Sequence, residues 1–188
     1  MSPTSTVSGP AQYLTFAMAG EEFAVEILHV REILSYEVVT KVPSCPPWIH
    51  GLMNLRGSVV PVVDLAMKFG LAASTISSQT CIVIVEVDSG DQATVMGVLA
   101  DSVNQVVDLK PEDIEPPPPF GTHVRVDFLL GMGRGDKRFL LLLDTGRVLS
   151  TEELLAVETL AGDEIPGPPA LAKEPAATGG EAQAKSNL

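Results

Sequence analysis

The sequence predicts a mainly β fold, built from two similar five-stranded units with a few short helices. Short apolar runs rich in β-branched residues alternate with glycine or proline turns about every 8 to 15 residues, which is typical of short strands. A similar pattern occurs twice along the chain, and hydrophobic residues make up 45% of the 188 residues, enough for a core. The formal net charge of −12 would repel a phosphate backbone, which argues against nucleic-acid binding.

The two ends of the chain differ in composition from its middle. Residues 1–10 are mostly Ser, Thr, Pro and Gly, and we expect a flexible leader there. Residues 163–188 are rich in Pro, Ala and Gly without any aromatic residue, and we expect a disordered tail. The folded part should therefore span residues 11–162. Without a signal peptide or an apolar run of about 20 residues, the chain is expected to be a soluble cytoplasmic protein.

The first expected element is a hairpin at the start of the folded part. Residues 13–18 and 23–25 are apolar segments joined by a turn at Gly20. Helices are few. A short helical turn is expected over residues 66–69, ended by a glycine, and a second helix over residues 150–155, where a serine provides a typical N-cap.

The remaining strands are expected at three apolar runs, residues 59–63, 81–87 and 139–143. Proline has no amide hydrogen to donate, so Pro61 favours an edge strand or the start of a strand for the first of these runs. The Pro116–Pro119 run should form an extended spacer within the second unit.

An internal repeat is the most informative feature of the pattern. Residues 23–33 line up with residues 96–106 at a constant offset. An Arg-Gly pair before an apolar strand that ends in Asp also occurs twice, over residues 56–64 and 134–144. This spacing indicates two similar β units that form small barrels, and chance similarity between valine-rich strands is the alternative.

Residue types with catalytic or metal-binding chemistry are scattered along the chain. Cys45 and Cys81 are isolated, and the three histidines have no zinc-binding spacing. The Gly131–Gly135 run lies between two apolar strands, which favours a hairpin loop over a nucleotide-binding loop. The sequence therefore predicts no catalytic residue, no metal and no cofactor, and hence no enzyme.

A polar turn within apolar sequence is the strongest candidate binding feature. The Asn54–Gly57 segment precedes an apolar strand, and the guanidinium of Arg56 can hold a carboxylate with two hydrogen bonds. Two interpretations remain open: an internal salt bridge with Asp64 or Glu32, and a recognition anchor for a partner. Trp48 follows a proline-rich segment and is expected to lie in the core.

Two stretches carry a resemblance to a known family. Residues 30–34 read Val-Arg-Glu-Ile-Leu, and residues 49–65 contain Asn-Leu-Arg-Gly followed by Pro and Asp. Together with the apolar segments at residues 97–103 and 141–144, they resemble the CheW family of chemotaxis coupling proteins over about residues 11–160. The resemblance implies two tandem SH3-like five-stranded β-barrels.

The same resemblance implies a function. CheW-like proteins are non-catalytic adaptors that join the cytoplasmic tips of methyl-accepting chemoreceptors to the regulatory domain of a CheA-type histidine kinase, which carries the same double barrel. The chain is thus expected in the cytoplasm, recruited to membrane-associated receptor arrays. A coupling protein of a pilus-motility or other non-flagellar chemosensory system is an alternative, as is a small-ligand-binding β-barrel.

Partner-binding residues follow from the positions that match the family pattern, and the two barrel subdomains are expected to be roughly interleaved around residues 11–75 and 78–150. The kinase-facing contact is expected on a strand of the second barrel, at Gly97 and Val98. The receptor-facing residues are expected to be Val30, Glu32, Gly51, Asn54 and Arg56.

Overall fold

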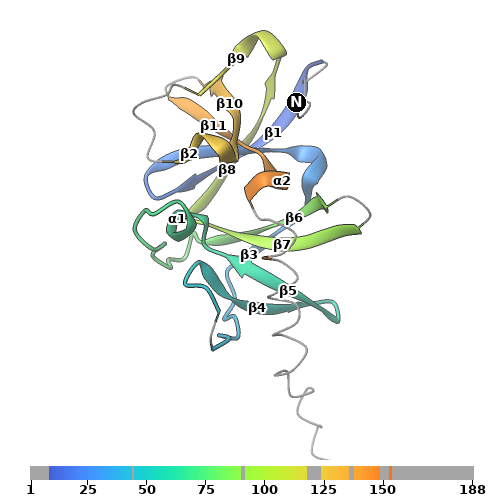
Figure 1. Ribbon diagram of the computed structural model, residues 1–188, viewed down its shortest axis with the longest axis vertical. Helices are drawn as coiled ribbons and strands as arrows, with labels where there is room; N and C mark the ends of the chain where they lie inside the picture. The colour runs from blue at the N-terminus through green and yellow to red at the C-terminus, as the bar shows by residue number, and fades with distance from the viewer. Residues whose placement is uncertain are drawn as a thin grey trace, which may run out of the picture.

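The computed structural model shows two mixed β-sheets that lie one above the other, with two short helices where they meet (Figure 1). The predicted tail and the predicted helix over residues 150–155, except Glu153, lie outside the described residues, as does the leader up to residue 8. The structure describes residues 9–43, 45–89, 92–117, 124–135, 138–148 and 153.

The strands divide between a six-stranded and a five-stranded sheet. The six-stranded sheet contains β1 (Ala11–Met18), β2 (Glu21–Glu26), β8 (Ser102–Leu109), β9 (Ile114–Glu115), β10 (Leu129–Arg134) and β11 (Phe139–Leu143). The five-stranded sheet contains β3 (Val30–Ser35), β4 (Ile49–Leu55), β5 (Ser58–Val63), β6 (Cys81–Ser89) and β7 (Gln92–Ala100). The helices are α1 (Leu65–Lys68), α2 (Thr145–Val148) and the 3-10 turns η1 (Ile27–His29), η2 (Pro111–Asp113) and η3 (Val126–Phe128).

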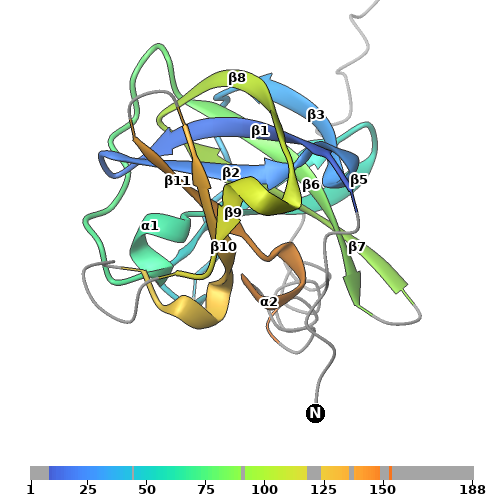
Figure 2. The ribbon, with the colours of Figure 1, turned by 90° about the horizontal axis from the view of Figure 1, so that it is seen from above.

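The prediction of a mainly β fold in two units is confirmed, but the strands do not divide into tandem halves near residue 75. The strand orders are β8-β1-β2-β11-β10-β9 and β3-β6-β7-β5-β4. The five-stranded sheet is one continuous stretch of chain, whereas the other takes strands from both ends. The reason is that the first hairpin pairs with late strands, β1 with β8 and β2 with β11. Seen from above, β1 and β2 overlie strands of the other sheet (Figure 2).

Both sheets have the same arrangement of strands, but the chain begins each sheet at a different strand of that arrangement. The β6–β7 hairpin corresponds to β1–β2, and β4–β5 corresponds to β10–β11. In each sheet the two hairpins are joined by one parallel pair, Val62 with Gly97 and Leu142 with Ala24. Gly97 therefore matches Ala24, as the sequence repeat predicted, and the shared pairing favours duplication over chance similarity. We call such positions matched positions.

Each sheet also closes on itself. In the six-stranded sheet, η2 carries the chain from β8 at one edge to β9, which pairs with β10 at the other edge. In the five-stranded sheet, the segment after β3 does the same: Thr40 and Leu52 of β4 exchange two backbone hydrogen bonds of 2.8 Å. One stretch of chain thus covers both edges, the way in which small barrels remove unpaired strands.

The core consists of three apolar clusters. The largest contains residues of both sheets, with Phe16 and Phe23 stacked on one side and Phe69 and Phe128 stacked on the other. The ring centres of Phe23 and Phe69 are 6.1 Å apart, and this contact joins the two stacked pairs. The second cluster lies within the five-stranded sheet and the third within the six-stranded sheet. Each sheet therefore has its own core, and a shared core joins them.

The expected position of Pro61 is wrong. Pro61 lies inside β5, which pairs with β4 on one side and β7 on the other. Its partner on β4 is Leu52, whose backbone groups both bond to Thr40 on the far side of β4. The pair is therefore one without hydrogen bonds between its residues. Pairing with β7 begins only at Val62, so no ladder bond needs the missing amide hydrogen.

Both short helices begin with an aspartate at the end of a strand. The predicted helical turn is α1, which starts at Leu65 after Asp64, whose side chain accepts a hydrogen bond from Met67 N. The sequence missed α2, although Asp144 precedes it in the same way and its Oδ1 accepts from Gly146 N. No helix in the described part of the chain is long and apolar enough to cross a membrane.

Candidate functional site

The candidate site is built around the tight turn between β4 and β5. Arg56 and Gly57 have φ values of 52° and 91°, so both central residues are left-handed, as in the two-residue turns of hairpins. The Asn54 side chain fixes the turn, because its Oδ1 accepts a 2.8 Å hydrogen bond from Gly57 N. A left-handed arginine is unfavourable in itself, and the turn holds its side chain at the tip of the hairpin.

Arg56 forms an ion pair with Glu32 of β3. Arg56 Nη2 lies 2.9 Å from Glu32 Oε2, and the two side chains are 79% and 23% exposed. Because the Arg56 side chain is largely exposed, its guanidinium is accessible to a partner. Ion pairs at this exposure also contribute little to stability. Of the two carboxylates considered for an internal bridge, Glu32 is the one engaged, and the pair is compatible with both interpretations of Arg56.

Asp64 is committed elsewhere. Its carboxylate is 2% exposed and accepts hydrogen bonds from Met67 N, from Ser74 N at 2.9 Å and from Ser74 Oγ at 3.2 Å. These bonds attach the loop after α1 to the end of β5. Asp64 therefore has a structural role near the site, and Arg56 does not use it.

The other predicted receptor-facing residues differ in accessibility. Asn54 is exposed, whereas Val30 is only partly exposed and packs against the core shared by the sheets. Gly51 is buried, and a Cβ there would lie 2.7 Å from Thr40 O and from Val39 Cγ2. Glycine at this position lets the segment after β3 pass close to β4.

Gly97 and Val98 do not lie on a second barrel. They belong to β7, inside the five-stranded sheet that also carries Arg56. Val98 is 4% exposed, and a Cβ on Gly97 would lie 2.7 Å from Ile82 Cγ2. The physical reason is that β7 pairs on both sides and is covered on both faces. Both residues are buried in this chain and shape the packing of the five-stranded sheet.

Sequence reasoning missed a second ion pair beside the first. Arg31 and Glu86 are 2.5 Å apart and bridge β3 and β6 where the register between the strands shifts. Such a bulge lets adjacent residues of one strand lie on the same side. Arg31 and Glu32 are adjacent opposite charges on an edge strand, and that pattern was the available signal.

A polar pair lies on the same sheet, at the end of β3. The Tyr36 hydroxyl and His50 Nε2 are 3.0 Å apart, and the two rings meet edge to face. Burial, and secondarily the charge of Lys41, lower the pKa of His50, while Asp64 opposes this shift. Among the described residues no group of three or more His, Cys, Asp or Glu side chains could hold a metal ion.

An apolar pocket lies between the sheets. Phe16, Val25, Met96 and Val98 are among its lining residues, and Thr145 is the lining residue with a polar side chain. A site for a polar small molecule needs several convergent polar or titratable groups. This pocket does not provide them, which disfavours the alternative of a small-ligand-binding barrel.

Comparisons with known proteins agree on one family. The CheW-like domain matches residues 12–153. The chemotaxis protein CheW of Klebsiella aerogenes is 33% identical over 150 residues, covering 80% of this chain and 88% of that protein. FrzA of Myxococcus xanthus is 28% identical over 148 residues, covering 78% and 89%.

A solved structure shows the same fold. The crystal structure of the scaffolding protein TtCheW from Thermoanaerobacter tengcongensis matches with a TM-score of 0.69 at 29% identity, covering 77% of this chain and 90% of that one. The family match extends over both sheets, and the structural match includes the β-rich architecture described above. The chain therefore belongs to the CheW-like domain family and is a chemotaxis coupling scaffold.

Proposed function

We propose that this chain is a non-catalytic adaptor that binds the cytoplasmic tip of a methyl-accepting chemoreceptor and the regulatory domain of a CheA-type histidine kinase at the same time. It works in the cytoplasm and is recruited to membrane-associated receptor arrays. The family assignment supports this role, and the two sheets suggest how one small chain contacts two partners.

The observation that carries the proposal is a set of exposed apolar residues at matched positions. Ile33 of β3 and Val106 of β8 are matched, with exposures of 43% and 48%. Val59 of β5 and Phe139 of β11 are matched as well, with exposures of 39% and 57%. Apolar side chains that stay exposed on both copies of a duplicated unit favour one docking face on each sheet.

The receptor-facing surface is assigned to the five-stranded sheet. Asn54 and Arg56 supply exposed polar and charged groups, the partly buried Glu32 pairs with Arg56, and Val59 lies opposite Asn54 on the paired strand. An accessible arginine beside apolar surface is a frequent anchor of protein interfaces. Val30 and Gly51 act beneath this surface, by packing.

The kinase-facing surface is assigned to the six-stranded sheet, where Val106 and Phe139 are exposed. The kinase regulatory domain carries the same double barrel, so an apolar face of one barrel can meet an apolar face of another. Gly97 and Val98 lie inside the five-stranded sheet, and substitutions there would change partner binding by altering the packing of that sheet.

The test is a titration with both partners. The purified protein should bind a CheA-type regulatory domain and a receptor hairpin tip simultaneously. Saturation with one partner should therefore still allow binding of the other. Phe139→Ser should weaken kinase binding alone, whereas Arg56→Ala should weaken receptor binding alone. Mutually exclusive binding, or binding of neither partner, would contradict the adaptor role.

The pathway that the adaptor serves is a separate question. FrzA is a relative of similar length coverage, so a pilus-motility or other non-flagellar chemosensory system is the second candidate. Affinity purification of the full chain from its own cells decides between them, because the kinase and receptors that co-purify identify the pathway.

A further inference from the structure

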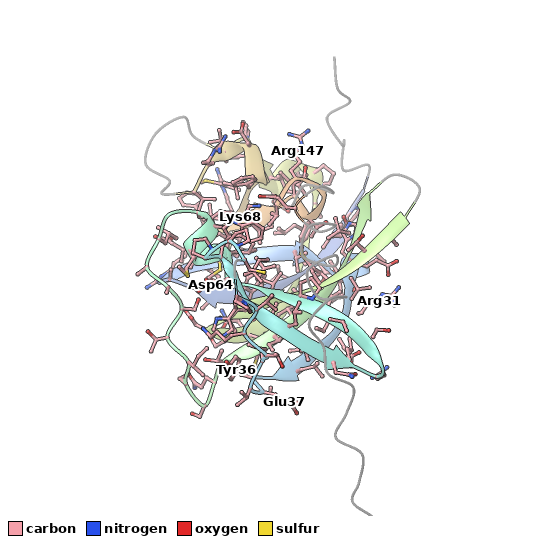
Figure 3. The ribbon with its side chains drawn as sticks, turned by 60° about the horizontal axis from the view of Figure 1, so that its bottom comes forward. Arg31, Tyr36, Glu37, Asp64, Lys68 and Arg147 are labelled. Carbon is pink, nitrogen blue, oxygen red and sulfur yellow. The ribbon has the colours of Figure 1, made fainter. Side chains whose placement is uncertain are left out.

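A buried lysine lies where the two sheets meet. The side chain of Lys68, the last residue of α1, is only 8% exposed, and its Nζ lies 2.7 Å from Glu153 Oε2. The same Nζ lies 4.3 Å from the centre of the Trp48 ring and 5.8 Å from the centre of the Phe128 ring. Figure 3 shows Lys68 between the blue-green elements of one sheet and the yellow-orange elements of the other.

The two aromatic rings occupy matched positions. Trp48 precedes β4, and its carbonyl oxygen accepts a 2.8 Å hydrogen bond from Asp64 N. Phe128 precedes β10, and its carbonyl oxygen accepts a 2.9 Å hydrogen bond from Asp144 N. The ammonium of Lys68 thus contacts the same structural position in each copy of the duplicated unit.

The lysine itself has no counterpart in the other copy. Backbone hydrogen bonds to Asp64 O and Asp144 O match Lys68 with Val148, the last residue of α2, which is 1% exposed. Arg125 Cζ also lies 5.4 Å from the centre of the Phe128 ring, but Lys68 is the cation within reach of both matched rings among the described residues. Its contact with both rings joins the copies and cannot arise within either copy alone.

Burial makes this contact sensitive to its partners. An ammonium taken out of water is unfavourable unless a carboxylate and polarisable groups compensate for the lost hydration. Glu153 and the faces of two aromatic rings supply that compensation here. Loss of one partner leaves a buried charge, so the ammonium favours one relative placement of its partners.

We propose that Lys68 is a positioning residue that holds the two sheets in one relative orientation, with Glu153 holding its ammonium in place at the junction. The inference deepens the proposed function, on which it rests for its biological meaning. In an adaptor with one docking face on each sheet, the angle between the sheets sets how the two bound partners are oriented to each other.

The first experiment needs no partner. Spin labels are placed at exposed Ser58 of β5 and Asp108 of β8, after Cys45 and Cys81 have been replaced by Ala, and the distance distribution between them is measured by pulsed electron paramagnetic resonance. Lys68→Met, which keeps the apolar stem, should broaden the distribution at least about twofold, because the apolar shared core alone then sets the angle between the sheets. Lys68→Arg should restore it.

Lys110→Met is the matched control. Lys110 is 63% exposed and pairs with Glu112 at 3.7 Å, so its loss should leave the distribution unchanged. If Lys68→Met does not fold, Glu153→Gln removes the charge of the carboxylate alone and should broaden the distribution to a smaller extent. A lowered melting temperature with an unchanged distribution in these variants would overturn the inference and leave a purely stabilising role.

A second measurement separates this inference from the proposed function. Lys68→Met should leave the affinity for each partner, measured separately, unchanged. In the complex with both partners it should reduce the receptor's control of kinase activity, and Lys68→Arg should restore that control. A broadened distribution with normal receptor control would keep the positioning role and contradict its part in signalling. If the wild-type chain binds neither partner, the proposed function is contradicted and the positioning role of Lys68 is not.

Discussion

The β4–β5 and β10–β11 hairpins are copies of one element that differ at the tip. β4–β5 turns through two residues, Arg56 and Gly57. In β10–β11 the last paired residues are Arg134 and Phe139, so the turn is longer, and it is closed by a hydrogen bond from Gly135 N to Arg138 O. By strand register, Arg134 matches Asn54 and not Arg56. The repeated Arg-Gly pair in the sequence therefore aligned two arginines that do not occupy matched positions.

Below the tips the two hairpins agree closely. Gly51 and Gly131 are matched, both at a register shift, and a Cβ on either would lie within 3 Å of a backbone oxygen of the segment that closes the sheet. Both tips nevertheless present an ion pair, Arg56 with Glu32 and Arg134 with Glu115 at 2.8 Å. The two copies share the frame and differ at the surface, as the proposed binding of two different partners requires.

The largest expected effect tests the shared frame. Gly51→Ala and Gly131→Ala should each destabilise the protein by about 2 kcal/mol or more, because a rigid backbone oxygen cannot yield to the added methyl group. Gly51→Ala should be the worse, since its Cβ would meet Thr40 O at 2.7 Å against 2.9 Å for Gly131 and Glu115 O. Urea unfolding measures both, with Gly9→Ala, whose Cβ would meet nothing within 4 Å, as the control.

The two aspartates that precede the helices should differ in importance. Asp64→Ala should cost about 2 to 3 kcal/mol, because it leaves the partly buried amide of Ser74 without its acceptor and removes the cap of α1. Asp144→Ala should cost about 1 kcal/mol, because it removes the bond from Gly146 N and the exposed pair with Arg147. Equal losses in thermal unfolding would show that the two copies depend on their caps alike.

The sequence was a good guide to what recurs at short range. The repeat of residues 23–33 at residues 96–106 is confirmed by strand pairing, and Trp48 packs against the core as predicted. Glu32 was one of two carboxylates, with Asp64, named as an internal partner of Arg56 from its place beside the polar turn, and the structure pairs Arg56 with Glu32.

What the sequence did not indicate depends on long-range pairing. The division of strands between sheets follows from β1 pairing with β8, about 90 residues away, which no local pattern encodes. The burial of Gly97 and Val98 has the same origin, since it depends on β7 being covered from both sides. The environment of Lys68 was missed because its three partners, Trp48, Phe128 and Glu153, come from separate segments of the chain.

A smaller effect concerns the surface that differs between the copies. Arg56→Ala should lower receptor affinity by about 1 to 3 kcal/mol while changing the free energy of unfolding by no more than about 0.5 kcal/mol, because its ion pair is exposed. Arg134→Ala is the control, because Arg134 forms an exposed ion pair of similar length on the other sheet. Isothermal titration against receptor tip and kinase domain, with urea unfolding, separates a recognition residue from an internal bridge. A stability loss larger than the affinity loss would favour the bridge.

Another difference lies inside the barrels. Tyr13 of β1 matches Ile82 of β6, both are buried, and the Tyr13 hydroxyl has no hydrogen-bond partner among the described residues. Tyr13→Phe should therefore raise the free energy of unfolding by about 1 kcal/mol. Burial, with a smaller effect from Glu26, raises the pKa of Tyr13, so the wild type should also lose stability above about pH 10, where the unfolded chain ionises more readily. A destabilised Tyr13→Phe variant would mean that the hydroxyl is satisfied.

The smallest expected effect is a pH dependence confined to one copy. Tyr36 and His50 match Leu109 and Leu130, so a polar pair in the five-stranded sheet replaces an apolar pair in the other. Because burial lowers the pKa of His50 in the folded chain, the unfolded chain binds the proton more tightly. Stability should be fully retained above about pH 6.5 and decrease as the pH falls below it. His50→Gln, which keeps an acceptor for the Tyr36 hydroxyl but does not titrate, should show a smaller decrease in urea unfolding between pH 7.5 and pH 5. The other histidines are present in both proteins, so parallel pH profiles would show that His50 is not buried enough to matter.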